Sequence, residues 1–273
     1  MPTPIWTPTK ARAEASVLTD FLRWLAAERE VKLADGPALH AWSVRDRGAF
    51  WAALWDYFGV VGDKGDGPWI TGDGILGERF FPGARLNFAE NLLFERSERP
   101  ALLFRGENGS RRSLSFEALH DRVARLAAAL ELAGVGPGDR VAGFLPNLPE
   151  TIIAMLATAS RGAVWSSCSP DFGINGVLDR FGQIRPRVLL TADGYHYGGK
   201  WIDSIAPAAR VAEELDSVEH IVLVPYDGDP DTAAKAAAEL PGAVPWGQFL
   251  GDGAPPPLTF ARLPFDHPLY VMY

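Results

Sequence analysis

The sequence predicts an α/β protein with a mainly parallel sheet and flanking helices, preceded by an aromatic-rich helical region. From Ser115 to Val224, short apolar runs alternate with amphipathic helical patterns at intervals of roughly 25 to 30 residues, which is typical of βαβ units. Before this stretch, aromatic side chains recur at helical spacing. We therefore expect two parts, an N-terminal region over residues 1–100 and a larger α/β domain over residues 101–273.

Two apolar stripes predict helices in the first part. Residues 17–25 place Val17, Phe21 and Trp24 on one helical face, and residues 50–58 form a second such stripe. We interpret their tryptophans as packing anchors, because large aromatic rings dominate burial. A turn-rich span, 59–83, follows. Its G-x-G-x-x-G pattern, Gly72 to Gly77, precedes no helical pattern and is interpreted as a turn.

The second part begins with a helix that Ser115 can cap and Gly134 can end. Pro149 can open the next helix, which ends at Gly162. In chain order, the expected strands and further helices are strand 140–145, strand 163–167, helix 174–183, strand 188–191, helix 203–215 and strand 220–224. The span 227–264 is looser, and residues 268–273 form a final apolar strand.

Composition excludes several classes of protein. The 273 residues are 47% hydrophobic and 22% charged, which is typical of globular proteins and not of disordered ones. The net charge of −8 disfavours binding to nucleic acid or to anionic membranes. The longest apolar stretch, 151–167, is interrupted by Arg161 and Gly162 and is too short to cross a bilayer. A single cysteine, Cys168, and no leader pattern at Met1-Pro2-Thr3 predict a cytoplasmic protein.

Short motifs give limited chemical information. Residues 194–201 nearly match a Walker A loop, but Trp201 stands where a magnesium-binding Ser or Thr is needed. A P-loop, a loop with one functional lysine and a plain surface turn all remain open. Cys168 lies just after the expected strand 163–167. It is interpreted as a small buried thiol, with a nucleophile as the alternative. The five histidines are scattered and predict no zinc site.

Several longer blocks carry a resemblance. They are residues 81–92 (FPGARLNFAENL), 138–147 (GDRVAGFLPN), 165–173 (WSSCSPDFG) and 178–184 (LDRFGQI). Together they resemble the acyl-CoA synthetase family of adenylate-forming enzymes, and the last two resemble its acetoacetate-activating branch. The resemblance implies the N-terminal part of that family's large domain. It also implies that the phosphate loop would follow Tyr273, so that these residues alone would be inactive.

The same resemblance implies an activity and a site. The activity would join acetoacetate to CoA through an acyl-adenylate, with ATP, Mg²⁺ and CoA as substrates or cofactors and no nucleic-acid or membrane partner. It assigns no catalytic, metal or ATP-binding residue to this chain. The positions that would lie near the CoA entrance are Ser169, Pro170, Asp171, Phe172, Tyr197 and Lys200. Lys200 keeps a positive charge found in relatives, whereas Tyr197 has lost one. The alternatives are an acetyl- or propionyl-CoA synthetase and a non-catalytic binding fragment.

Overall fold

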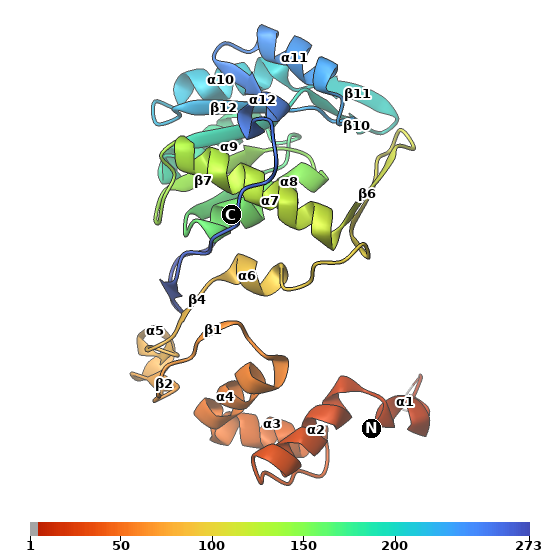
Figure 1. The fold of residues 1–273 in the computed structure, drawn as a ribbon, viewed down its shortest axis with the longest axis vertical. Helices are drawn as coiled ribbons and strands as arrows, with labels where there is room; N and C mark the ends of the chain where they lie inside the picture. The colour runs from red at the N-terminus through yellow and green to blue at the C-terminus, as the bar shows by residue number, and fades with distance from the viewer. Residues whose placement is uncertain (1–4) are drawn as a thin grey trace. The chain divides into compact units, whose positions relative to one another are not determined.

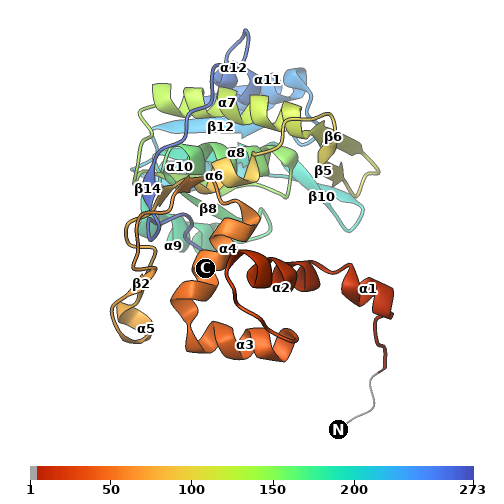
Figure 2. The same ribbon diagram turned by 60° about the horizontal axis from the view of Figure 1, so that its bottom comes forward.

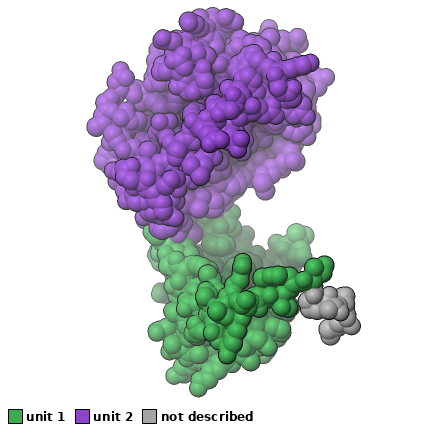
Figure 3. Space-filling model, turned by 90° about the vertical axis from the view of Figure 1, so that its right-hand side faces the viewer, with its two compact units in different colours: residues 1–85, 264–266 green, residues 86–263, 267–273 purple. Residues whose placement is uncertain are grey.

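The protein is described by a computed structural model that covers residues 5–273. The start at Met1-Pro2-Thr3, used above for the leader, lies outside this range. The chain forms two compact units, coloured separately in Figure 3. Unit 1 runs to Arg85 and includes Pro264–Asp266, and unit 2 comprises Leu86–Leu263 and His267–Tyr273. The assignment of 1–100 and 101–273 to the domains of the resembled family stays a prediction.

Unit 1 contains a small helical core. Its helices are α1 (Lys10–Glu14), α2 (Val17–Glu28), α3 (Gly36–Arg45) and α4 (Arg47–Phe58). The side chain of Ser16 caps α2 by accepting from the Thr19 amide. Both expected helices are confirmed, although Val17 at the start of the first stripe is exposed. Trp24 packs edge-on against Tyr57 at 5.6 Å, as expected of a packing anchor.

The rest of unit 1 is built from turns and very short elements. These are β1 (Gly62–Asp63), β2 (Ile70–Thr71), α5 (Gly74–Gly77) and β3 (Arg79–Phe80), with β4 (Arg85–Leu86) and β14 (Leu263–Pro264) where the chain passes between units. The G-x-G-x-x-G pattern spans the connection from β2 to β3, and no helix follows it. The turn expected there is present between β2 and β3, and it includes the single-turn helix α5.

Unit 2 is organised around a five-stranded sheet in the order β13-β12-β9-β7-β8, in which every neighbouring pair is parallel. Its strands are β7 (Arg140–Phe144), β8 (Val164–Cys168), β9 (Val188–Ala192), β12 (His220–Val224) and β13 (Ala243–Pro245). The four strands expected before residue 225 are confirmed. The span expected to be looser supplies the fifth strand, β13.

Helices connect the strands. They are α6 (Phe88–Leu92), α7 (Phe116–Leu132), α8 (Pro149–Ser160), α9 (Ile174–Ile184), α10 (Ile205–Glu214), α11 (Pro230–Glu239) and α12 (Trp246–Leu250). Four of them, α7 to α10, were expected from the sequence. Ser115 caps α7, and Gly134 follows its end with φ +76°. The helix α11 was missed within the looser span, although its alanines favour helix and Asp229 caps it.

The side chains of alternate strand residues are buried on opposite faces of the sheet. Val141 and Leu190 join the core beneath α7 and α8, whereas Phe144 and Leu189 join the core beneath α9 and α10. Unit 2 is therefore a three-layer α/β/α arrangement, whose helices and strands can be followed in Figures 1 and 2. No helix within residues 5–273 is long and apolar enough to cross a membrane.

Two hairpins and a final extended segment complete unit 2. The strands β5 (Pro100–Arg105) and β6 (Arg111–Ser115) pair antiparallel, as do β10 (Gly194–Tyr197) and β11 (Lys200–Asp203). At the end of the chain, Tyr270 forms a parallel bridge with Trp165 of β8. The strand expected over 268–273 is therefore present as one bridge at the outer edge of β8.

Candidate functional site

The two segments that the sequence singled out both follow strands at the carboxyl edge of the parallel sheet. The loop Ser169–Gly173 follows β8, and the β10–β11 hairpin follows β9. These strands flank β7 on its two sides. The chain also leaves β7 and β9 toward opposite faces of the sheet, into α8 and α10 respectively. Open α/β sheets bind ligands at such a switch point, so this edge is the candidate site.

The loop and the hairpin lie within electrostatic reach of each other. Burial raises the pKa of Tyr195 in β10, and the charge of Asp171 in the loop raises it further. Asp171, Phe172 and Ser169 are exposed, while Pro170 is half-buried. The charge of Asp171 in the loop thus acts on Tyr195 in the hairpin, and most of the loop is open to solvent.

The near-Walker sequence forms a β-hairpin. Gly198 and Gly199 form its two-residue turn with φ +58° and +76°, and positive φ at both positions is what a type I′ hairpin turn needs. Lys200 opens the strand β11, whereas a P-loop lysine lies at the start of a helix. The P-loop alternative is therefore wrong, because hairpin pairing and not helix formation follows the glycines.

Tyr197 and Lys200 share one face of this hairpin. They are directly paired across the strands, and both side chains are exposed. Within residues 5–273, Lys200 has no carboxylate partner within 4.0 Å. Glu107 lies near the turn, because its carboxylate accepts a hydrogen bond from the Gly199 amide at 3.4 Å. On the other face, His196 and Trp201 pack against Tyr226 with ring centroids 5.4 and 5.7 Å apart. One face therefore anchors the hairpin and the other is free.

Cys168, the last residue of β8, is only 3% exposed. Burial raises the pKa of its thiol, and the positive charge of Arg180 opposes this only in part. A protonated thiol is a weak nucleophile. The interpretation as a small buried thiol is confirmed.

Three further residues near this edge were assigned no role from the sequence. Asp193, directly after β9, accepts hydrogen bonds from the amides of Gly194 and Tyr226 at 3.0 and 2.8 Å. It therefore ties the base of the hairpin to the loop after β12. An acidic residue directly after a mostly apolar strand was the available signal. The other two, Arg180 and Glu150, depend on partners distant in the sequence, which spacing alone does not reveal.

Glu150, in the first turn of α8, is 3% exposed and pairs with Arg112 of β6 at 2.8 Å. The guanidinium of Arg112 also lies over the ring of Phe104 at 4.9 Å. A buried carboxylate at a helix N-terminus is stabilised by the helix dipole and by its cation. This pair holds the β5–β6 hairpin against α8 and leaves no cation there for a ligand.

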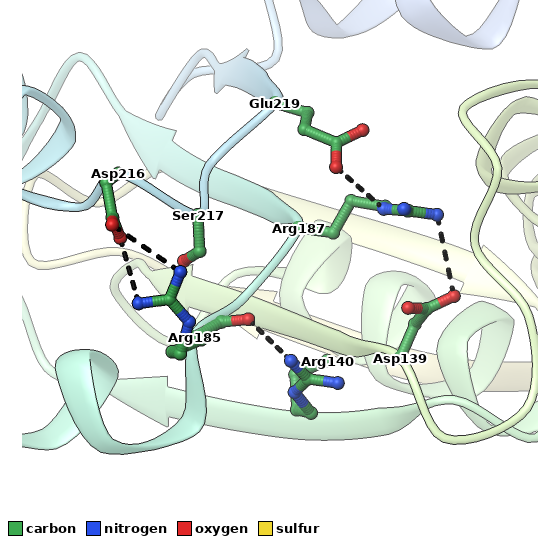
Figure 4. A pocket seen from close by; sticks show the side chains of 7 residues that line it. All are labelled: Asp139, Arg140, Arg185, Arg187, Asp216, Ser217 and Glu219. Atoms are coloured by element: carbon green, nitrogen blue, oxygen red, sulfur yellow. Dashed lines mark hydrogen bonds and ion pairs between the residues drawn. The ribbon is translucent and has the colours of Figure 1, made fainter.

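A polar pocket of about 330 Å³ lies at the opposite, amino edge of the sheet (Figure 4). Its arginines are already engaged. Arg187 pairs with Glu219 at 3.1 Å, and Arg185 pairs with Asp216 at 3.1 Å. Arg140 donates to backbone carbonyls at the end of α9. Each of these arginines already has a partner. Their ion pairs and hydrogen bonds connect residues near the amino ends of the strands, so this pocket is not the candidate site.

Comparisons with known proteins place this geometry in context. Residues 90–273 match the family described as "AMP-binding enzyme". The acetoacetyl-coenzyme A synthetase of Rhizobium meliloti (strain 1021) is 47% identical over 270 residues, covering 99% of this chain and 41% of the relative. The malonamoyl-CoA synthetase of Penicillium aethiopicum is 34% identical over 251 residues, covering 86% of this chain and 34% of the relative.

A solved structure agrees with the sequence comparisons. The acetoacetyl-CoA synthetase from Streptomyces lividans superposes with a TM-score of 0.89 at 38% identity, covering 100% of this chain and 41% of that one. The fold expected from the resemblance is therefore confirmed. The chain spans about 41% of the length of these acetoacetyl-CoA synthetases.

Proposed function

The chain belongs to the AMP-binding enzyme family, and on that premise we propose that its residues serve an acetoacetate–CoA ligase. The reaction converts ATP, acetoacetate and CoA into AMP, pyrophosphate and acetoacetyl-CoA. A carboxylate oxygen attacks the α-phosphorus of ATP and pyrophosphate leaves, which gives an acyl-adenylate. The CoA sulfur, having lost its proton, then attacks the acyl carbon and AMP leaves. The observation that carries this proposal is the 47% identity over 99% of the chain with an acetoacetyl-coenzyme A synthetase.

The names of the relatives also support a substrate class. Acetoacetate and malonamate are both short carboxylic acids with a second carbonyl group two carbons from the carboxylate. A relative named for each acid matches this chain. We therefore propose short acids with a β-carbonyl group as the class, and acetoacetate as its member here. Acetate and propionate lack that carbonyl group and should be poor substrates.

We propose that the described residues contribute to the step in which CoA binds and reacts. Lys200 presents an exposed ammonium group, which forms no ion pair within residues 5–273, on a hairpin face suited to a phosphate group of CoA. Tyr197 beside it offers an aromatic ring in place of a second cation. The loop Ser169–Phe172 forms the facing side of this edge. We propose these residues as the CoA entrance, with Asp171 and Pro170 shaping the loop.

The family implies magnesium. Within residues 5–273, no three His, Cys, Asp or Glu side chains gather closely enough to hold a metal ion, so these residues do not form a metal site from protein ligands alone. We also propose a reducing compartment, the cytoplasm, because the one cysteine is buried and free.

The test measures acid-dependent pyrophosphate release by the full gene product with ATP, magnesium and CoA. Acetoacetate should support the fastest release, malonamate a slower one, and acetate or propionate little. Faster pyrophosphate release with acetate or propionate would instead identify an acetyl- or propionyl-CoA synthetase. No release with any acid, despite CoA binding, would favour the non-catalytic alternative. A second sample, the 273 residues alone, tests the expectation that they are inactive by themselves.

A further inference from the structure

The loop Ser169–Gly173 has few anchors of its own. Within it, the Phe172 amide donates to the Ser169 carbonyl at 3.1 Å. The helix α9 then begins after Gly173 without a side-chain cap. Most of the loop is exposed to solvent. A loop of this kind samples several conformations unless a side chain holds it.

Arg180 of α9 supplies that side-chain contact. Its guanidinium carbon lies 4.7 Å from the centroid of the Phe172 ring and 5.7 Å from that of Tyr273. The Arg180 Nη1 donates to the Gly176 carbonyl one turn earlier, at 2.7 Å. The Tyr273 hydroxyl donates to the Arg180 carbonyl at 2.8 Å. The guanidinium is thus fixed by its own helix and by Tyr273, and Phe172 rests against it.

The chemistry of this contact requires arginine. Among residues 5–273 Arg180 has no carboxylate partner within 4.0 Å, so aromatic rings are its principal charge-compensating neighbours. A guanidinium is planar and can lie over aromatic rings, whereas an ammonium group offers no such plane. Lysine at this position would keep the charge and lose the stacked geometry.

We propose that Arg180 is a positioning residue for the CoA step, which holds Phe172 and thereby the loop Ser169–Gly173 in the conformation that receives CoA. The proposal rests on the proposed function, since it deepens the CoA entrance described there. It predicts that replacing Arg180 weakens CoA binding and leaves adenylation unchanged. The reason is that the Arg180–Phe172 contact involves no residue assigned to ATP or to the acid.

The test compares Arg180→Lys, Phe172→Leu and the double variant in the full gene product. The matched control is Arg210→Lys on α10, which packs beside α9 and whose side chain has no partner among the described residues. Steady-state assays give the KM for CoA, acetoacetate and ATP. Acetoacetate-dependent exchange of pyrophosphate into ATP, measured without CoA, reports adenylation alone, and calorimetry reports CoA binding directly.

We expect Arg180→Lys to raise the KM for CoA about three- to tenfold, the range for one or two cation–π contacts. Phe172→Leu should also raise it, and the double variant should be no worse than Arg180→Lys alone, because Phe172→Leu removes a contact that Arg180→Lys already removes. The exchange rate, the other KM values and the control should stay at wild-type levels. If Arg180→Lys does not fold, Phe172→Leu carries the test.

An unchanged KM for CoA in Phe172→Leu and Arg180→Lys would overturn the inference. So would an equal loss in exchange and in all three KM values, which would indicate a general structural role. If the wild-type protein uses CoA with a different acid, only the assignment of acetoacetate is overturned. The KM for CoA of the variants, compared with wild type, would still decide the role of Arg180. A wild type that neither uses nor binds CoA would overturn both proposals.

Discussion

Tyr197 lies directly opposite Lys200 across a two-glycine turn, so an aromatic ring and an exposed ammonium group share one face of the β10–β11 hairpin. The other face of the same hairpin packs Trp201 and His196 against Tyr226. The hairpin is therefore a rigid support whose free face presents a cation at the carboxyl edge of the sheet. Predictions about CoA follow from this placement.

Replacing Lys200 with Ala should raise the KM for CoA about two- to fivefold, because an exposed ion contact contributes about 0.2–1 kcal/mol. The KM for acetoacetate should not change. Lys200→Arg keeps the charge and should stay close to wild type, and Arg210→Ala controls for loss of a surface cation elsewhere. Steady-state kinetics of the full gene product measure all three. Unchanged CoA kinetics in Lys200→Ala would leave this lysine as an ordinary surface residue.

Replacing Cys168 with Ser should preserve turnover, because a buried thiol with a raised pKa is protonated and does not act as the nucleophile. The expected cost is in stability, about 1–3 kcal/mol for burying a hydroxyl group where a thiol lay. Thiol labelling should be slow in the native protein and fast in denaturant. Loss of turnover by a folded Cys168→Ser protein, with an acyl-cysteine adduct trapped in the wild type, would contradict this.

The sheet could be predicted from the sequence because its signals are local. Each of β7, β8, β9 and β12 is a short apolar run between helical patterns, and capping residues such as Ser115 mark helix ends. The strand β13 has only three residues and lies between the short helices α11 and α12, so no periodicity marks it. Its pairing with β12 is decided by tertiary packing.

The candidate site was predicted only in part, for a similar reason. Lys200 and the loop after β8 stood out through the motif-like sequence and the resemblance. Arg180 lies in a block that carries the resemblance but was assigned no role, because its contacts with Phe172 and with Tyr273, 93 residues later in the chain, form only in the fold. Asp193 likewise acts through the amide of Tyr226, 33 residues away. Such contacts exist only once the parallel strands bring their carboxyl ends together.

Asp193 should make stability depend on pH. Burial raises the pKa of its carboxyl group, so the folded protein holds this proton to higher pH than the unfolded chain does. The free energy of unfolding should therefore fall as pH rises from below the ordinary carboxyl value through the raised pKa. Asp193→Asn removes this titration and keeps an acceptor oxygen for the Gly194 and Tyr226 amides.

Urea unfolding at about pH 4.5 and about pH 8 measures this effect. Asp193→Asn should gain stability relative to wild type at the higher pH. Asp193→Ala should lose about 1–3 kcal/mol at both, because two buried amides lose their acceptor. A difference between Asp193→Asn and wild type that is independent of pH would contradict the assigned titration.

Replacing Gly194 with Ala should displace the hairpin and so weaken CoA use from a distance. A Cβ at Gly194 would lie 2.5 Å from the backbone oxygen of Ile202 and 2.4 Å from the Trp201 ring. The ring could turn, but the backbone oxygen can move only if β11 moves, and β11 carries Lys200. We therefore expect the KM for CoA to rise about as much as in Lys200→Ala, about two- to fivefold.

The matched control for this substitution is Gly182→Ala on the exposed side of α9, where a Cβ meets nothing within 4 Å. That change should stabilise the protein by about 0.5–1 kcal/mol and leave the kinetics unchanged. Combining Gly194→Ala with Lys200→Ala should raise the KM for CoA little beyond either single change, because both act through one ammonium group. Additive effects would mean that the hairpin contacts CoA through another group, and Tyr197, on the same face, would be the next residue to replace.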